Sequence, residues 1–413
     1  MEKTHVVTCF LRHESDILLL KRSDNVGSYA GKWGGVAGHA EGSPDAAARK
    51  EIIEETGLTT DDVSFIRSGN TFDVRNDDYH WVVHPYLFST STRDITTNWE
   101  TDTHVWVPPP EILHRDTVPK LWQSYKAVKP SIESIASDNE HGSHYLSIRA
   151  LEVLRDRVAE LRHQESAEWE QVVNLIEKLC DVRPSMVVIA NRIRRIAGRV
   201  GEPSLDELQD SLQSGIDELQ AINDTIASNI ESKIHNHVII TISRSETVLN
   251  ALRHCNPDKV IVSESRPGKE GIDVAKNLAG IDIATQLTTD AALPKILTKG
   301  DCVVIGADQI SVNGTIINKV GSYPLAVVGF VHDIPVYVLA SRDKIVKEHT
   351  EITENGDPLY QGDKDISSKN PIFELVPDKF LSAIVTEDGI QDLDEFSEYA
   401  KAKIKQRSKV WNT

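Results

Sequence analysis

The sequence predicts an α/β protein in which an α/β/α sandwich is followed by a helical cap and a doubly wound parallel sheet. Near the N-terminus, strand-like apolar runs precede a glycine-rich loop and a helix. Between about residues 145 and 233 the apolar residues recur at helical spacing, with no strand-like alternation. From His237 onward short β-rich runs alternate with helical segments, which is typical of parallel strands joined by crossover helices.

The first domain is expected to span residues 1–128. Its helix should begin at Ser43-Pro44, since serine is a favoured N-cap and proline a favoured first-turn residue. The last expected strand runs into a proline-rich turn that closes the domain. The expected strands are HVVTCFL (5–11), DILLLKR (16–22), WVVHPYLFS (81–89) and HVWVPPPEIL (104–113).

The segment KEIIEETGL (50–58) is the most informative part of this domain. Glu51, Glu54 and Glu55 stand at positions i, i+3 and i+4 of one helix, so their Cβ atoms lie within about 5–6 Å of one another. Three adjacent carboxylates repel unless a cation lies among them, and oxygen ligands suit Mg²⁺ or Mn²⁺. Gly57 should end the helix in the left-handed conformation. A solvated acidic helix face is the alternative.

The segment GKWGGVAGHAEGSPDAAARKEIIEETGL (31–58) resembles the Nudix box, in which Gly, five residues, Glu and seven residues precede REUxEExGU, with U aliphatic. The second half matches, with Lys50 in place of the family's Arg. The preceding loop is about two residues short, so Gly38 and Glu41 align only across a gap. The resemblance implies a Mg²⁺-dependent (or Mn²⁺-dependent) hydrolase. It assigns metal binding and catalysis to the residues Glu51, Glu54 and Glu55, and we assign Arg22 to substrate binding.

The second half of the chain begins with a polar, serine-containing linker at 129–144, followed by a helical cap at 145–235 and a sheet domain at 236–413. The expected buried parallel strands in the sheet domain are VIITIS, KVIVSES, DCVVIGADQI and IPVYVLAS.

This half is similar to a superfamily that contains the regulatory subunits of translation initiation factor 2B, the methylthioribose-1-phosphate isomerases and the archaeal ribose-1,5-bisphosphate isomerases. The similarity covers roughly 270 residues in order and implies a Rossmann-like domain. The segments that carry it are RPSMVVIANRIRRI (183–196), VSESRPGKEG (262–271), TTDAAL (288–293), VVIGADQISVNGTIINKVGSYPLA (303–326), IPVYVLAS (334–341) and NPIFELVPDKFLSAIVTEDGI (370–390).

The isomerases of that superfamily use a catalytic Cys and Asp. The resemblance assigns the Asp to Asp308, whereas TISRS (241–245) puts Ser243 in the place of the Cys. A hydroxyl is a much poorer proton donor than a thiol near neutral pH, so we expect binding without turnover. Cys255 lies twelve residues later, out of register, and the glycine-rich substrate loop of the family is absent from 141–154. The resemblance assigns substrate binding to Arg266, Asn318 and Lys319, together with Ser243.

Composition limits the remaining function classes. The formal net charge of −18 argues against general nucleic-acid binding, which depends on Lys and Arg. The four cysteines show no CxxC spacing, so neither a disulfide framework nor a zinc site is expected. No apolar run approaches the roughly 18 residues of a membrane span, and no leader is evident, so we expect a cytoplasmic protein. The histidines lack metal-site spacing and are expected to be surface or structural residues: His13, His39, His141, His144, His235 and His237.

Three functions remain open at this stage. The first is a Nudix hydrolase of a nucleoside diphosphate derivative whose second domain binds a phosphosugar or nucleotide. The second is an aldose–ketose isomerase in which Ser243 or another residue replaces the cysteine. The third is a non-catalytic relative of translation factors that binds the initiation GTPase. The superfamily resemblance also implies a homodimer formed through the C-terminal domain.

Overall fold

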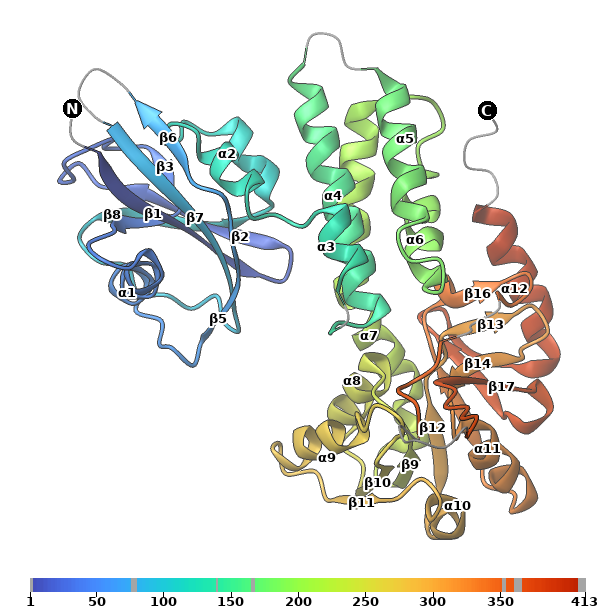
Figure 1. The fold of residues 1–413 in the computed structure, drawn as a ribbon. Helices are drawn as coiled ribbons and strands as arrows, with labels where there is room; N and C mark the ends of the chain where they lie inside the picture. Colours follow the sequence, from blue (N-terminus) through green and yellow to red (C-terminus); the bar gives the residue numbers. More distant parts are fainter. Residues whose placement is uncertain are drawn as a thin grey trace. The chain divides into compact units, whose positions relative to one another are not determined.

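A computed structural model describes residues 3–75, 80–138, 140–164, 168–350, 354–359 and 366–407 (Figure 1). The chain forms two compact units. One contains Met1–Ser131 and Glu152–Ala167, and the other contains Ile132–Leu151 and Glu168–Thr413. Helix α4 (Ser143–Arg162) therefore contributes residues to both units. Asn139 of the expected linker lies outside the described residues.

The first unit contains an eight-stranded mixed sheet. At its centre β1 (Thr4–His13) pairs in parallel with β7 (His80–Thr90) and antiparallel with β2 (Asp16–Arg22) and β4 (Val36–His39). The remaining strands are β3 (Trp33–Gly34), β5 (Val63–Ser68), β6 (Phe72–Arg75) and β8 (Thr101–Val107).

Successive residues of β1 face opposite sides of this sheet, as the period of a strand requires. Cys9 packs toward α1 (Pro44–Thr56), and Phe10 packs toward η1 (Pro109–His114) and α2 (Leu121–Lys126). Both residues are fully buried, so the sheet has a hydrophobic core on each face. This arrangement is the α/β/α sandwich predicted from the sequence.

The C-terminal half of α4 completes the first unit. Trp122 of α2 donates its indole N–H to Glu160 at 3.2 Å, and Lys129 Nζ lies 3.6 Å from the fully buried Asp156. The stretch 129–144, expected to be a linker, contains helix α3 (Ile132–Ala136) and the first residues of α4.

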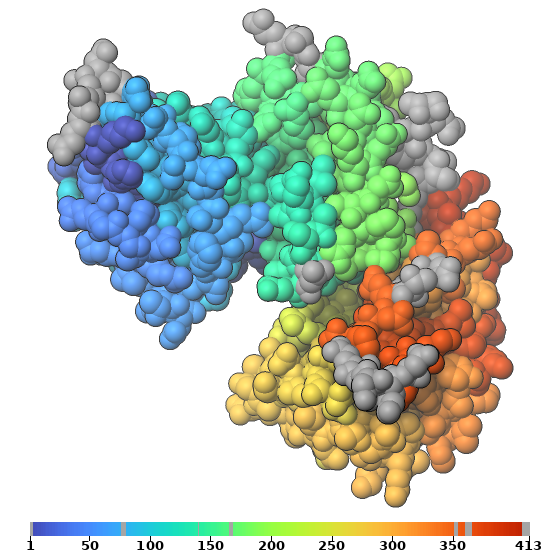
Figure 2. All heavy atoms as spheres, in the orientation of Figure 1, coloured from blue at the N-terminus to red at the C-terminus, as the bar shows by residue number. Residues whose placement is uncertain are grey.

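The second unit begins with a layer of helices, which are coloured green in Figures 1 and 2. Its longest member, α7 (Leu205–Ile234), starts at Ser204, whose hydroxyl accepts a hydrogen bond from the Glu207 N–H. Ile230 and Ile234, one turn apart near the end of α7, enter the core of the following sheet. The other helices of this layer are α5 (Trp169–Cys180) and α6 (Val187–Ala197).

The second unit also contains a seven-stranded sheet in the order β11-β10-β9-β12-β15-β18-β19, parallel except for the last strand. Helices cover both faces, so the sheet is doubly wound and confirms the predicted α/β class (Figure 1). The strands are β9 (Val238–Thr241), β10 (Lys259–Ser263), β11 (Thr285–Thr288), β12 (Cys302–Ile305), β15 (Val336–Leu339), β18 (Ala383–Thr386) and β19 (Gly389–Asp392). The helices are α8 (Glu246–Cys255), α9 (Gly271–Ala279), α10 (Leu293–Ile296), η2 (Leu297–Lys299), α11 (Ser322–Val331), η3 (Arg342–Lys344), η4 (Asp378–Phe380) and α12 (Leu393–Arg407).

DCVVIGADQI, expected to be one strand, is divided. The chain leaves β12 at Ile305, turns through 306–308, and enters β13 (Gln309–Ser311) of a separate four-stranded sheet. The division places Asp308 just beyond the carboxyl end of β12. The other strands of the small sheet are β14 (Ile316–Lys319), β16 (Ile345–Val346) and β17 (Phe373–Val376).

A buried ionic cluster joins the helical layer to the doubly wound sheet. Asp343 of η3 is fully buried and accepts hydrogen bonds from Arg195 at 2.9 Å and from Arg192 at 3.3 Å. Glu218 of α7 accepts a hydrogen bond from Arg195 at 2.8 Å.

Among the described residues, no helix is both long enough and apolar enough to span a bilayer.

Candidate functional sites

Helix α1 presents the predicted glutamates beside strand β4. Ala48 and Ile52 are fully buried and fix the face of α1 that packs on the sheet. Gly57 ends the helix at φ +68°, and its N–H donates to the Ile53 carbonyl at 3.0 Å. The prediction for this helix end is confirmed.

Glu55 is buried, with 5% of its surface exposed. One of its carboxylate oxygens accepts a hydrogen bond from the Ala37 N–H of β4 at 2.9 Å. Burial raises the pKa of Glu55 to about 8. The Ala37 bond opposes this shift, and the negative charges of Glu100 and Glu51 add to it.

Glu51 lies against the backbone of the same strand. A Cβ atom at Gly38 would lie 2.0 Å from Glu51 Cδ, so only glycine at position 38 leaves room for this carboxylate. Burial raises the pKa of Glu51, and the charge of Glu54 adds to the shift. The structure therefore brings Glu51 and Glu55 to one flank of α1.

Glu54 is the most exposed of the three glutamates. About half of its side chain is exposed, and it pairs with Lys50 Nζ at 3.5 Å. Throughout the described segments of the chain, no three His, Cys, Asp or Glu side chains already converge as a set that could hold a metal ion. The i, i+3, i+4 spacing therefore does not by itself bring the three glutamate side chains together around one metal position.

The donor chemistry at this flank nevertheless fits a hard divalent cation. Glu51, Glu55 and Glu100 supply carboxylate oxygens, and the pKa values of Glu51 and Glu55 are raised partly because these negative charges repel one another. A cation among them would remove that repulsion. Glu100 lies in the loop before β8, where no sequence pattern marked it.

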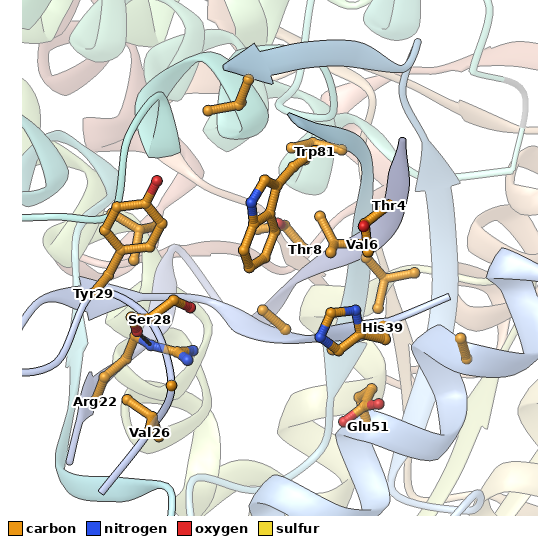
Figure 3. A pocket seen from close by; sticks show the side chains of 18 of the residues that line it. Thr4, Val6, Thr8, Arg22, Val26, Ser28, Tyr29, His39, Glu51 and Trp81 are labelled. Atoms are coloured by element: carbon orange, nitrogen blue, oxygen red, sulfur yellow. Dashed lines mark hydrogen bonds between the residues drawn. The ribbon is translucent and has the colours of Figure 1, made fainter. Parts of the chain in front are cut away.

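A cavity of about 910 Å³ opens beside these carboxylates, and Glu51, Glu100 and Glu41 are among the residues that line it. Arg22, assigned to substrate binding, also lines it, and the Arg22 Nε–H donates to the Ser28 carbonyl at 2.9 Å (Figure 3). The positive charge of Arg22 lowers the pKa of Glu55. The structure therefore places Arg22 in the cavity beside the glutamates.

Aromatic rings line the rest of the cavity. Tyr29 and Trp81 face it with ring centroids 6.3 Å apart and planes 51° apart (Figure 3). His39 lies between Trp81 and Glu51, with its centroid 6.0 Å from that of Trp81. His39 was expected to be a surface or structural residue, but it lines the cavity. The sequence did not indicate a role for Tyr29 and Trp81, because they lie in separate segments that carry no motif.

A second cluster surrounds Asp308 in the other unit. The Asp308 N–H donates to the Ile317 carbonyl at 2.8 Å, which ties its turn to β14. Burial raises the pKa of Asp308, and the charges of Lys344 and Lys319 oppose the shift. Lys344 donates to the Ala307 carbonyl, and burial lowers its pKa.

The residues of β14 lie beside this turn. Asn318 is buried and donates to the Ser322 hydroxyl at 2.8 Å. Lys319 Nζ lies 2.6 Å from Glu270 Oε1. Ser243, after β9, adopts φ +67°, and its hydroxyl donates to the same Glu270 oxygen at 3.1 Å. Glu270, which sequence reasoning had not singled out, therefore links Ser243 to Lys319.

Arg266, assigned to substrate binding, and Cys255, out of register with the isomerase cysteine, make other contacts. Arg266 is 60% exposed in its side chain and pairs with Glu264 at 3.7 Å. Cys255 is buried at the end of α8, where its thiol contacts the Ala227 carbonyl at 3.5 Å. The structure thus does not bring Cys255 to the turn that holds Ser243.

Comparison with known proteins gives two matches along the chain. Residues 139–392 match the Initiation factor 2 subunit family, and residues 2–128 match the NUDIX domain. An eIF-2B subunit 2-like protein of Pyrococcus furiosus is 28% identical over 271 residues, which are 63% of this chain and 94% of that protein. A ribose 1,5-bisphosphate isomerase of Methanocaldococcus jannaschii is 25% identical over 285 residues, 64% of this chain and 91% of that protein.

Solved structures agree with the sequence matches. The translation initiation factor eIF-2B of Pyrococcus horikoshii superposes with a TM-score of 0.54 at 27% identity and covers 63% of this chain and 95% of its own. The 5-methylthioribose 1-phosphate isomerase of the same organism superposes with a TM-score of 0.52 at 20% identity and covers 66% of this chain and 86% of its own. This second similarity is evidence for the fold alone.

Proposed function

Because this chain belongs to the Initiation factor 2 subunit family and carries a NUDIX domain before it, we propose a hydrolase fused to a ligand-binding domain. The N-terminal domain splits the P–O–P bridge of a nucleoside diphosphate derivative. The C-terminal domain binds a phosphosugar or nucleotide. The protein acts in the cytoplasm.

One observation carries the hydrolase proposal: a single cavity has carboxylates at one end and an aromatic pair at the other. Glu51, Glu100 and Arg22 line the polar end, and Tyr29 and Trp81 face the same space. A substrate that fits both ends has a charged bridge joined to a planar ring. A nucleoside diphosphate derivative meets this requirement.

The spacing of the two rings supports a stacked base. A planar ring packed at van der Waals distance on both sides needs roughly 7 Å between its neighbours. The Tyr29 and Trp81 centroids are 6.3 Å apart and their planes are inclined by 51°, so a base that stacks on the face of one ring also contacts the other ring. Stacking on an aromatic side chain stabilises a nucleobase by about 1–3 kcal/mol.

The polar end of the cavity carries the residues that we assign to metal binding and phosphate binding. We assign Glu51, Glu54 and Glu55 to holding Mg²⁺ or Mn²⁺, with Glu100 as a fourth carboxylate. When bound, the ion neutralises the charge that develops on the diphosphate oxygens. Arg22 lines the cavity and binds the remaining phosphate charge. Gly38 keeps Glu51 in place because no Cβ atom obstructs its carboxylate.

The C-terminal proposal rests on Asp308, Asn318 and Lys319 near the carboxyl end of β12. Ligands of open α/β sheets bind at this edge. The similarity to ribose 1,5-bisphosphate isomerases points to a ribose phosphate as the ligand. The similarity to eIF-2B subunit 2-like proteins supports the alternative, a regulator that binds the initiation GTPase.

We assign a homodimer to the same domain. Phe330 and Val331 of α11 are 60% and 66% exposed, and Phe330 lies against Phe380 with centroids 5.6 Å apart. Apolar surface of this kind is typical of subunit interfaces. Analytical ultracentrifugation of the full chain measures the state directly, and a monomer at micromolar concentration contradicts this assignment.

The test of the hydrolase is a product screen with Mg²⁺ over nucleoside diphosphate sugars, dinucleoside polyphosphates and nucleoside triphosphates. We expect cleavage of at least one nucleoside diphosphate derivative, and no cleavage by Glu55→Gln. Lys50→Arg is the matched control on the same helix, and it should remain active. Absence of cleavage across the panel contradicts the proposed hydrolase.

A further inference from the structure

Trp99 is an exposed aromatic residue in the wall of the N-terminal cavity. It is 65% exposed, yet it lines the same cavity as Tyr29 and Trp81. Among the residues that the structure describes, its indole forms no aromatic pair and no hydrogen bond. The ring is therefore available for stacking with a ligand.

Hydrogen bonds hold the turn that carries Trp99. The Asn98 side chain accepts the Glu100 N–H at 2.9 Å, and the Asn98 carbonyl accepts the Thr101 N–H at 3.3 Å. The Glu100 carbonyl accepts the Ser23 N–H at 2.7 Å, which ties the turn to the end of β2. Because a tryptophan has few side-chain torsions, a ring on such a fixed backbone loses little conformational freedom when a ligand stacks on it.

Trp99 is also the neighbour of a carboxylate that we assign to the hydrolase site. Burial raises the pKa values of Glu51 and Glu55, and the charge of Glu100 adds to both shifts, so these carboxylates lie close together. A phosphate bridge held beside them has a group attached on each side. The aromatic pair described above serves one of these groups, and Trp99 lies within reach of the other.

The surroundings of Trp99 favour a planar ring as its ligand. A single exposed aromatic residue is common on protein surfaces, but Trp99 lines a cavity. A protein partner would need apolar surface around the indole, whereas the flanking residues are polar, in the segment TTNWETDT (96–103). A sugar would need hydrogen-bonding groups, and the Asn98 side-chain oxygen is already used within the turn. A nucleobase requires only the face of the ring.

We infer that Trp99 forms a second base site and that the substrate is a dinucleotide, in which two nucleosides are joined through a diphosphate or longer phosphate bridge. One base stacks on Tyr29 and Trp81, and the other stacks on Trp99. This inference rests on the hydrolase role proposed above and names its substrate class. The cavity of about 910 Å³ lies near the upper end of the usual range of about 300–1,000 Å³, which leaves room for a ligand with two rings.

Hydrolysis of such a substrate yields two nucleotides. The oxygen of one water forms a bond to one phosphorus as the bond between that phosphorus and the bridging oxygen breaks. The bridging oxygen leaves on the other phosphate with the electron pair of the broken bond. The two protons of the water pass to the product phosphates or to solvent, and no oxidant or reductant is consumed.

The experiment compares two substrates that differ only in the second base. Diadenosine diphosphate and ADP-ribose both contain an adenosine joined through a diphosphate to a ribose, but only the first carries adenine on that ribose. For the full chain with Mg²⁺, we expect kcat/KM to be roughly 5- to 150-fold higher for diadenosine diphosphate, as stacking of one base predicts. Diadenosine tetraphosphate and adenosine tetraphosphate are the matched pair for a longer bridge.

Substitutions at Trp99 test the residue itself. Trp99→Ala should bring the ratio of the two kcat/KM values close to one, whereas Trp99→Phe keeps a ring and should retain most of the preference. Phe65→Ala is the control, because Phe65 is an exposed aromatic residue of β5 outside the cavity lining, and the ratio should stay at the wild-type value. Because both values come from one protein sample, partial unfolding cancels in the ratio.

Binding provides a second readout. Calorimetry with diadenosine diphosphate on the Glu55→Gln variant, which should not cleave it, gives a reference Kd. Adding Trp99→Ala to that variant should raise the Kd by roughly 5- to 150-fold. An unchanged Kd overturns the role of Trp99.

The outcomes separate the second base site from the hydrolase itself. Cleavage of compounds with one base, with no gain from a second base, overturns this inference and leaves the proposed hydrolase intact. A preference for two bases that survives in Trp99→Ala overturns the role of Trp99. Absence of cleavage of every compound, including those of the product screen, overturns both this inference and the proposed hydrolase.

Discussion

The backbone N–H of Ala37 donates a hydrogen bond to the Glu55 carboxylate at 2.9 Å, within the buried contact between β4 and α1. This single bond fixes one carboxylate oxygen and leaves the other for a ligand. Because the group is almost fully enclosed, its charge is costly unless a cation is close. The protonation of Glu55 and metal binding should therefore compete.

The first prediction concerns stability as a function of pH in the absence of divalent ions. The pKa of Glu55 is raised from 4.5 to about 8 in the folded protein, so between these values the native state binds more protons than the unfolded state. Stability should therefore fall as the pH rises from about 5 to 8. Thermal unfolding in EDTA measures this, and Glu55→Gln should flatten the dependence.

A second prediction follows for Mg²⁺. Since the ion replaces the proton on Glu55, its stabilising effect should be larger at pH 8.5 than at pH 6. Thermal unfolding with and without MgCl₂ at the two pH values gives the comparison. If MgCl₂ raises the melting temperature equally at both pH values, the protonation of Glu55 is not linked to metal binding.

The third prediction concerns the metal-binding helix. Glu54→Gln and Glu55→Gln should each reduce hydrolysis by at least 100-fold, because each removes an anionic ligand, while Lys50→Arg preserves the contact with Glu54 and should be tolerated. Steady-state kinetics on the substrate found in the screen measures these effects. Near-wild-type turnover by both glutamine variants would refute the assignment of this helix.

The fourth prediction concerns the aromatic pair. Tyr29→Ala and Trp81→Ala should each raise KM by roughly 5- to 150-fold, which corresponds to about 1–3 kcal/mol of lost stacking. Tyr29→Phe keeps the ring and is the matched control, so its KM should stay close to the wild-type value. Unchanged KM in both alanine variants would place the base elsewhere.

The fifth prediction concerns the extent of the N-terminal unit. The sequence predicted a first domain that ends at residue 128. The structure gives this unit residues 152–167 as well, through the contacts Trp122–Glu160 and Lys129–Asp156. A fragment ending at 131 should therefore unfold at a lower temperature than one ending at 167. Equal melting temperatures would show that these contacts add nothing.

A last prediction tests the ionic cluster of the second unit. Asp343→Ala leaves the buried Arg192 without its carboxylate and should destabilise the protein by about 3–5 kcal/mol. Glu398→Ala removes a carboxylate from an exposed pair with Lys401, where the cost should stay below about 1 kcal/mol. Urea unfolding of both variants provides the comparison. A small loss in Asp343→Ala would mean that the cluster relaxes around the gap.

Local patterns in the sequence predicted the layers well, because strand and helix periods are set by neighbouring residues. Three expected strands of the sandwich (5–11, 16–22 and 81–89) and the end of α1 at Gly57 lie where the pattern placed them. The fourth, expected at 104–113, was wrong beyond Val107, because its prolines enter the 3-10 helix η1. DCVVIGADQI was interpreted as one strand because a short β-rich run of this kind is typical of a buried parallel strand. The turn at 306–308 depends on a partner strand, β14, that comes later in the chain.

The site was only partly predictable for the same reason. Helical spacing brought Glu51 and Glu55 together, but the pairing of Glu54 with Lys50 depends on which face of α1 the sheet covers. Glu100 and Glu270 approach their partners only through tertiary packing. No spacing along the chain could have marked either residue.

Gly38 gives the N-terminal domain a way to lose activity without losing a glutamate. The smallest possible change there, the addition of one methyl group, places an atom where the Glu51 carboxylate lies, so that carboxylate has to move out of its position beside β4. A chain could thus keep every glutamate of its helix and still be inactive. The acidic motif alone is therefore an incomplete signature of a working enzyme, and the residue at position 38 must be read together with it.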